Sequence, residues 1–216
     1  MKLQATIALF VLIIVTAMPA AAQVGVKPAG AKEVDPKTLS AEEKADIARR
    51  VGAISGPGKE HKEILAAMEG SWDVTVKAWS TPGGKPMQFR GSSTSKRILG
   101  GMFLQQDTTS QMGGMTVSSM SIVGFDRRSQ NFTLVAFDSM GTYPVTAAGP
   151  YDPKTQTITM YGEDWDPIMR VTQKYNFIMR LKSKDEFVTE IVFLDKSHGN
   201  EGPFKMVEVT SNRRKK

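Results

Sequence analysis

Cysteine is absent from this 216-residue chain, and histidine occurs only twice. A chain without cysteine has no disulfide and no thiol nucleophile, so its stability must come from a packed core. The two histidines, His61 and His198, lie far apart in the sequence, which argues against a catalytic triad and against a histidine-based zinc site. We therefore predict no metal, no cofactor and no catalytic residue, and we favour a binding protein over an enzyme.

Long apolar runs are also lacking, with one exception at the N-terminus. Lys2 precedes an apolar stretch over residues 7–15, and Pro19 is followed by three alanines at 20–22. This order is typical of a secretory signal peptide, and the stretch is too short to span a bilayer. We expect residues 1–22 to be removed, the mature protein to be exported to the periplasm or beyond, and no integral membrane contact after cleavage.

The formal net charge is +6, and part of it lies in a basic tail over residues 213–216. A terminal basic run is most often solvated. No basic–aromatic motif accompanies it, so we predict no nucleic-acid partner. The oligomeric state is left open.

Two short helices are predicted ahead of the main domain. Residues 23–37 are polar and aperiodic and are expected to form a flexible leader. A capping-box pattern at Ser40–Glu43 begins a helix over 41–51, with Gly52 as its expected C-terminal cap. Helix-breaking residues at 56–58 separate this first helix from a second predicted helix over 59–68. We treat residues 38–69 as a helical extension whose second helix covers one end of the main domain.

From Trp72 onward the apolar period changes from helical to alternating. Strands are predicted at 72–79, 87–98, 102–110, 116–125, 132–138, 142–149, 157–161, 170–181, 186–194 and 203–211, with turn-forming residues between them. About ten evenly spaced strands with short turns indicate an up-and-down antiparallel meander, and closure would remove its two edges. The expected fold class is all-β, with a closed barrel over residues 70–212.

Two of the predicted strands are rich in serine and threonine on both faces. They lie at 90–97 and 116–121. Such strands suit the wall of a cavity that holds water or a ligand. They also suit a sheet with one solvent-exposed face. The sequence favours neither interpretation over the other.

Several short blocks resemble a bacterial family described as domain of unknown function 1579. These blocks are Leu65–Trp72, Gly91, Arg97–Leu104, Met112–Met115, Gly124–Asp126 and Gly149–Asp152. The resemblance implies a lipocalin-like (calycin-type) barrel in which Gly70-Ser71-Trp72 packs across the closed end and the preceding helix acts as a lid. It implies no activity. Two departures are Phe125, where the family more often has tyrosine, and the additional helix within 38–56.

A lipocalin-like barrel predicts a small apolar or amphipathic ligand as the partner. The expected lining residues are Trp72, Phe89, Met115, Tyr175 and Phe177, and Arg97 shares the inward parity of Phe89 and is the candidate anchor for a polar group. Two alternatives stay open. One is a hydrolase or isomerase that uses Asp138 or the acids in a predicted loop at 163–166, and the other is an interaction domain with a filled interior.

Overall fold

The computed structural model describes residues 32–168, 170–194 and 202–215, so the predicted signal peptide, His198 and the leader up to residue 31 lie outside it. Two helical segments precede the strands, and a 3-10 turn follows β2. The elements are α2 (Ala41–Ile54), η1 (His61–Leu65), β1 (Gly70–Ala78), β2 (Met87–Ile98), η2 (Leu99–Gly101), β3 (Phe103–Met112), β4 (Met115–Asp126), β5 (Asn131–Asp138), β6 (Val145–Gly149), β7 (Tyr151–Asp152), β8 (Thr157–Asp166), β9 (Val171–Ser183), β10 (Glu186–Phe193) and β11 (Phe204–Arg213).

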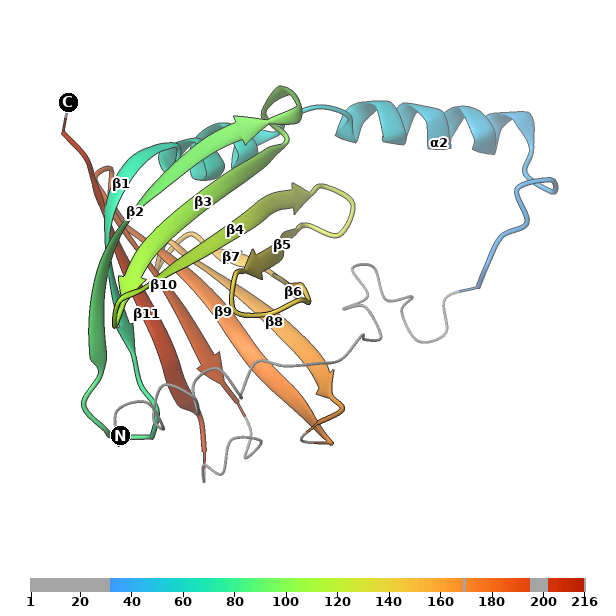
Figure 1. The fold of residues 1–216 in the computed structure, drawn as a ribbon. Coiled ribbons are helices and arrows are strands. Elements are labelled where there is room, and N and C mark those ends of the chain that lie inside the picture. Colours follow the sequence, from blue (N-terminus) through green and yellow to red (C-terminus); the bar gives the residue numbers. More distant parts are fainter. Residues whose placement is uncertain (1–31, 169, 195–201, 216) are drawn as a thin grey trace.

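Helix α2 begins where the capping box predicts. The Ser40 side chain accepts a bond from the Glu43 backbone N–H, and the Glu43 carboxylate accepts one from the Ser40 N–H at 2.8 Å. The predicted end at Gly52 is wrong, because the helix continues to Ile54 and Ser55 caps it. Alanine and valine around Gly52 sustain the helix through a single glycine, which costs only about 1 kcal/mol. None of its residues is buried, and it extends away from the barrel (Figure 1).

The second helix covers residues 59–67 and has a π-helical turn over His61–Leu65. Its inner face buries His61, Ile64 and Leu65, and the chain enters β1 directly after it. It lies across one end of the barrel in Figure 1. We call this end the closed end and the opposite end the mouth.

The strands form a single antiparallel sheet that closes on itself. The order is β6-β5-β4-β3-β2-β1-β11-β10-β9-β8-β7, and a further pairing of β6 with β8 joins its two ends. Ala148 lies opposite Tyr161 at this junction. Ten of the eleven described strands have five residues or more, and β7 has two. The predicted closed meander is thus confirmed (Figure 1).

Strand alternation divides the side chains into an inner and an outer set. Trp72 and Val74 on β1 face the interior with Phe187 on β10, and all three belong to the apolar core. Since successive residues of a strand point to opposite sides, the registers assign the other strands in the same way.

One predicted strand is too short. The prediction ended it at 161 and placed the acids 163–166 in a loop, whereas β8 continues to Asp166. The alternating acids read as turn formers in the sequence, but the register with β9 carries through them, with Asp164 opposite Gln173 and Asp166 opposite Val171. Asp164 and Asp166 therefore face inward and Glu163 faces outward.

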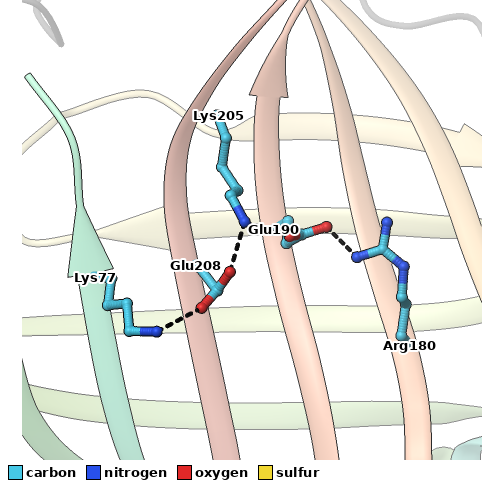
Figure 2. Close-up of polar contacts among 5 residues, drawn as sticks. All are labelled: Lys77, Arg180, Glu190, Lys205 and Glu208. Atoms are coloured by element: carbon cyan, nitrogen blue, oxygen red, sulfur yellow. Dashed lines mark hydrogen bonds and ion pairs between the residues drawn. The ribbon is translucent and has the colours of Figure 1, made fainter. Parts of the chain in front are cut away.

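A chain of charges crosses the outer face of β1, β11, β10 and β9 (Figure 2). Lys77 and Lys205 both bond Glu208, at 3.1 and 2.6 Å, and Lys205 also bonds Glu190 at 2.8 Å. Arg180 pairs with Glu190 from the other side. Burial alone would raise the pKa of Glu190, but the bonds from Lys205 and Arg180 outweigh it and lower the pKa. Arg180 thus points outward from β9.

Helices long and apolar enough to cross a membrane do not occur among the described residues.

Candidate functional site

The closed end of the barrel is sealed by Trp72 and its neighbours. The indole Nε1 donates a 3.1 Å bond to the Met68 carbonyl at the end of the preceding helix. The Phe187 ring meets the indole edge-on at 4.7 Å, and the Arg213 guanidinium lies 4.2 Å from the ring centroid. Arg213 also donates to the carbonyls of Ala67 and Glu69 and so ties the last strand to the covering helix. This half of the interior is a packed core.

Toward the mouth, some inward-facing side chains stay accessible to water, whereas Ala78, Phe193 and Phe204 there are buried. On β1 the burial falls from Trp72 and Val74 to the half-buried Val76, and on β9 Phe177 is more exposed than Tyr175 or Met179 on either side. We call this inner surface the accessible lumen. Its lining residues are Val76, Phe89, Thr108, Val117, Ser119, Ser121, Ala136, Phe177, Ile191, Val207 and Val209.

One wall of the lumen is polar. Ser93, Thr108, Ser119 and Asp138 lie opposite one another in a row across β2 to β5, and Ser95, Gln106 and Ser121 form the next row. Gln106 and Thr108 donate to the Ser93 hydroxyl at 3.1 and 3.0 Å. The serine- and threonine-rich segments thus place part of their polar side chains on the interior, as the cavity-wall interpretation predicts. We call these two rows the polar wall.

Two buried hydroxyls in the interior have no hydrogen-bond partner in the protein. Ser95 belongs to the polar wall, and Ser211 faces inward from β11, opposite Val74 on β1 and Phe187 on β10. Ser95 is 3% exposed, Ser211 is fully buried, and both hydroxyl oxygens are unpaired. An unpaired buried hydroxyl costs about 1–3 kcal/mol, so an interior that holds these groups favours a polar guest or ordered water.

The facing wall is mainly apolar, with Thr189 and Ser211 as polar positions on it. It consists of half-buried and buried side chains from β1, β2 and β9 to β11, which lie on the interior by register and strand parity: Val76, Phe89, Phe177, Ile191, Phe193, Phe204, Val207 and Val209. We call this set the apolar wall. Polar and apolar surfaces therefore oppose each other across the lumen, which is an arrangement that fits an amphipathic molecule.

Three inward carboxylates and a tyrosine gather at the mouth, and we call Asp138, Tyr143, Asp164 and Asp166 the acidic rim. Asp138 ends β5 and accepts bonds from the N–H groups of Met140 and Gly141 at 2.8 and 3.0 Å. Asp166 accepts bonds from the Ile168 N–H and the Gln173 amide. Burial raises the pKa of Tyr143, and all three carboxylates lie close enough to add to this effect.

Tyr175 joins the acidic rim to β6. Its ring lies against Gly162, where an added β-carbon would come within 2.2 Å of a ring atom, so this position requires glycine. The Tyr175 hydroxyl lies 3.0 Å from the Thr146 carbonyl and 3.2 Å from the Asp164 carboxylate. The hydroxyl donates toward both oxygens and shares its one proton between them. Burial raises the pKa of Asp164, and the bond from the Tyr175 hydroxyl opposes this rise.

The predicted lining residues take different positions. Phe89 and Phe177 lie in the accessible lumen, Trp72 forms part of the packed base beneath it, and Tyr175 is buried beside the rim. Met115 faces inward by parity but lies at the tip of the β3–β4 hairpin and is 41% exposed. Arg97 has the predicted inward parity, yet it lies at the closed end, where its Nε donates a 2.8 Å bond to the Glu69 carboxylate.

The acidic rim shows what the sequence interpretation missed. Asp138 and the acids at 163–166 were considered only as an enzymatic alternative, and their convergence on Tyr143 depends on β8 running to Asp166. The signal for a longer β8 is the alternation along residues 158–166. Ile158, Met160, Gly162, Asp164 and Asp166 are every second residue, so a continuous strand places all of them on one face. Within the described part of the chain, no three histidine or carboxylate side chains are placed to hold a metal ion.

A model of the protein family described as "Protein of unknown function (DUF1579)" matches residues 56–213, well over half of the chain. The chain belongs to this family. The match covers the covering helix and every strand of this DUF1579 barrel and leaves out α2. A comparison with curated proteins gives no match.

Solved structures similar to this DUF1579 protein include a lyase and a designed barrel. The S-type phycobiliprotein lyase CPES from Guillardia theta has a TM-score of 0.51 at 7% identity, over 74% of this chain and 99% of the lyase. A de novo designed fluorescence-activating β-barrel has a TM-score of 0.40 at 8% identity, over 70% and 98% of the two chains. The likeness to the lyase concerns the fold alone.

Proposed function

We propose that this protein binds a small amphipathic molecule in the accessible lumen. The observation that carries the proposal is the division of a water-accessible interior into a polar and an apolar wall, with two unpaired buried hydroxyls, Ser95 and Ser211, toward the closed end beneath it. A barrel that served only as a scaffold would gain stability by filling this space with apolar side chains, because packed interiors leave few voids.

The ligand lies with its apolar part along Phe89, Phe177 and Val209, above the base that Trp72 forms. Burying about 200 Å² of apolar surface there contributes about 5 kcal/mol before the costs of association. Hydroxyls of the polar wall hold its polar groups. Arg97 takes no part in this arrangement, because Glu69 already occupies its guanidinium.

Two further elements belong to the proposal. The first is a lipocalin-like classification, which the position of Trp72 at the closed end, bonded to the end of the covering helix, supports. The second is export, which the signal-peptide pattern of residues 1–22 supports. An exported carrier would bind its ligand outside the cytoplasm.

A hydrolase or isomerase is the second candidate, and the convergence of Asp138, Asp164 and Asp166 on Tyr143 favours it. Carboxylates with different environments can serve as an acid and a base. Binding ranks first because the described interior offers no nucleophile paired with a base. If the second candidate holds, Asp138→Asn abolishes a turnover while leaving ligand affinity intact.

Binding is tested with a neutral solvatochromic dye such as Nile red and a pair of adjacent substitutions. Ala136 on β5 faces the lumen, and Val135 beside it faces outward and is 36% exposed. Ala136→Trp places an indole inside the lumen and should weaken dye binding at least tenfold. Val135→Trp adds the same side chain outside and should leave it unchanged. Equal effects of the two substitutions, or no dye binding by the unsubstituted protein, contradict the proposal.

A further inference from the structure

Inward-facing cationic and acidic side chains lie at opposite ends of the barrel. The inward arginines, Arg97 and Arg213, both lie at the closed end and are engaged, Arg97 by Glu69 and Arg213 by Trp72 and three backbone carbonyls. The inward carboxylates of the acidic rim all lie at the mouth. The whole chain carries a net charge of +6, so this acidic mouth does not follow from composition.

The carboxylates of the acidic rim and the carboxylates on the outer face have different bonding partners. Glu190 and Glu208 outside share three cations, as Figure 2 shows. Asp138 instead accepts backbone N–H groups, and Asp164 meets only the Tyr175 hydroxyl. No described lysine or arginine lies within ion-pair distance of Asp138 or Asp164. The Asp164 carboxyl group therefore lies in a half-buried place without a cation beside it.

A second observation concerns the same barrel interior. Ser211 is fully buried, points inward between Val74 and Phe187 and has no partner for its hydroxyl. It is independent of the acidic rim, since it lies on β11 toward the closed end. The rings of Tyr143 and Tyr175 beside the carboxylates add surfaces that attract a cation.

We infer that the ligand carries a protonated amine, which lies between Asp138 and Asp164 at the rim, with its apolar part directed into the lumen. This inference rests on the proposed lumen binding and adds the charge of the ligand. An ammonium group donates three hydrogen bonds and neutralises the half-buried carboxylate. A carboxylate or phosphate head would instead face like charges in a site of reduced dielectric constant.

Three probes that share the same alkyl chain and differ in their head group distinguish the contribution of the head group from that of the tail. Decylamine, decan-1-ol and decanoate are titrated into the mature protein at pH 7, below their aggregation limits, by calorimetry or by displacement of Nile red. The amine should bind at least tenfold more tightly than the alcohol, and decanoate more weakly than either. The preference for the amine should shrink as salt rises, because ions screen the attraction.

Substitutions at the acidic rim then locate the head group. Asp164→Asn should remove most of the preference for the amine and leave the affinity for decan-1-ol within about twofold, which also shows that the variant folds. Asp138→Asn should act in the same direction. Glu163→Gln is the matched control, because Glu163 is adjacent on β8 and points outward. It should leave all three affinities unchanged.

The outcomes distinguish this inference from the function on which it rests. Equal affinities for amine and alcohol overturn the inference and leave lumen binding in place. A preference for the amine that survives both aspartate substitutions also overturns it, because the cation then binds elsewhere. Failure of Nile red and of all three probes to bind removes the proposed function itself.

Discussion

Arg213, the last residue of β11, lies over the indole of Trp72 near the start of β1, with 4.2 Å between the guanidinium carbon and the ring centroid. The same guanidinium donates to the carbonyls of Ala67, Glu69 and Lys184 at 2.8–2.9 Å. One side chain therefore connects the first strand, the last strand, the covering helix and the β9–β10 turn. This contact fastens the closed end of the barrel.

Arg213→Ala should lower the free energy of unfolding by about 2–3 kcal/mol, because three carbonyl bonds and a cation–π contact are lost together. Arg213→Lys should recover less than half of this, since an ammonium cannot reproduce the planar donor geometry. Urea unfolding followed by tryptophan fluorescence measures both. Arg214→Ala is the control, because Arg214 forms an exposed pair with Asp73 and should cost less than about 0.5 kcal/mol. Equal losses at 213 and 214 would refute this role.

His61 should make stability depend on pH. Its Nδ1 accepts the Gly58 N–H at 3.1 Å, and its Nε2 is buried without a partner. Burial lowers the pKa of His61 below its ordinary 6.5, and Arg127 lowers it further, while Glu60 and the Phe125 carbonyl oppose them. The neutral form is thus the native one, and stability is lost as pH falls below the unfolded-state pKa.

The expected loss is about 1 kcal/mol between pH 7 and pH 5, beyond what the carboxylates contribute. His61→Gln keeps an acceptor for the Gly58 N–H and does not titrate. The difference in unfolding free energy between protein and variant should therefore change with pH over this range. A constant difference would show that His61 is not the titrating group.

Gly162→Ala should displace Tyr175. The new methyl group would lie 2.2 Å from a ring atom and 2.6 Å from the Thr146 carbonyl oxygen. We expect a loss of about 1–3 kcal/mol in stability, as for other overpacked sites, together with weaker ligand binding. Gly202→Ala has no heavy atom within 4 Å of the added carbon and serves as the control. Thermal unfolding of the two variants gives the comparison, and an unchanged G162A protein would exclude a tightly packed Tyr175.

Glu190→Gln should destabilise the barrel through the outer charge network. Glu190 is buried and faces Arg180 and Lys205, so its removal leaves two cations together. We expect a loss of about 1–2 kcal/mol, moderated because both cations are about one-third exposed. Asp73→Asn, at an exposed pair, should cost less than about 0.5 kcal/mol. Chemical denaturation at low and high salt would measure this, and no difference between the two variants would contradict it.

Export is tested by sequencing the N-terminus of protein recovered from outside the cytoplasm. The pattern of residues 1–22 predicts that the mature chain begins at Gln23. A chain that retains Lys2 and remains in the cytoplasm would contradict the prediction.

The fold was predictable because alternation and turns are local signals. Val74 and Val76 alternate with Asp73 and Thr75, and each turn carries glycine, proline or aspartate, so strands and class follow from short windows. The end of β8 was not predictable in this way. Acids at 163, 164 and 166 have the composition of a turn, and only their pairing with β9 keeps them extended.

The site was less predictable than the fold. Strand alternation shows whether a side chain faces the interior, but it does not show how far along the barrel axis that side chain lies. Arg97 and Phe89 both face inward, but eight residues of extended strand separate them, so one lies at the closed end and the other near the mouth. The same limitation applies to Met115, whose hairpin carries it to the barrel's edge. Convergence of Asp138, Tyr143 and Asp164 from three segments required the closed sheet.

A crystal structure of the mature protein grown with decylamine or Nile red tests the central proposal most directly. The account predicts a bound molecule inside the barrel, in contact with Phe177 on one side and with Ser119 on the other. An interior filled by the protein's own side chains, or a molecule bound only outside the barrel, would contradict it.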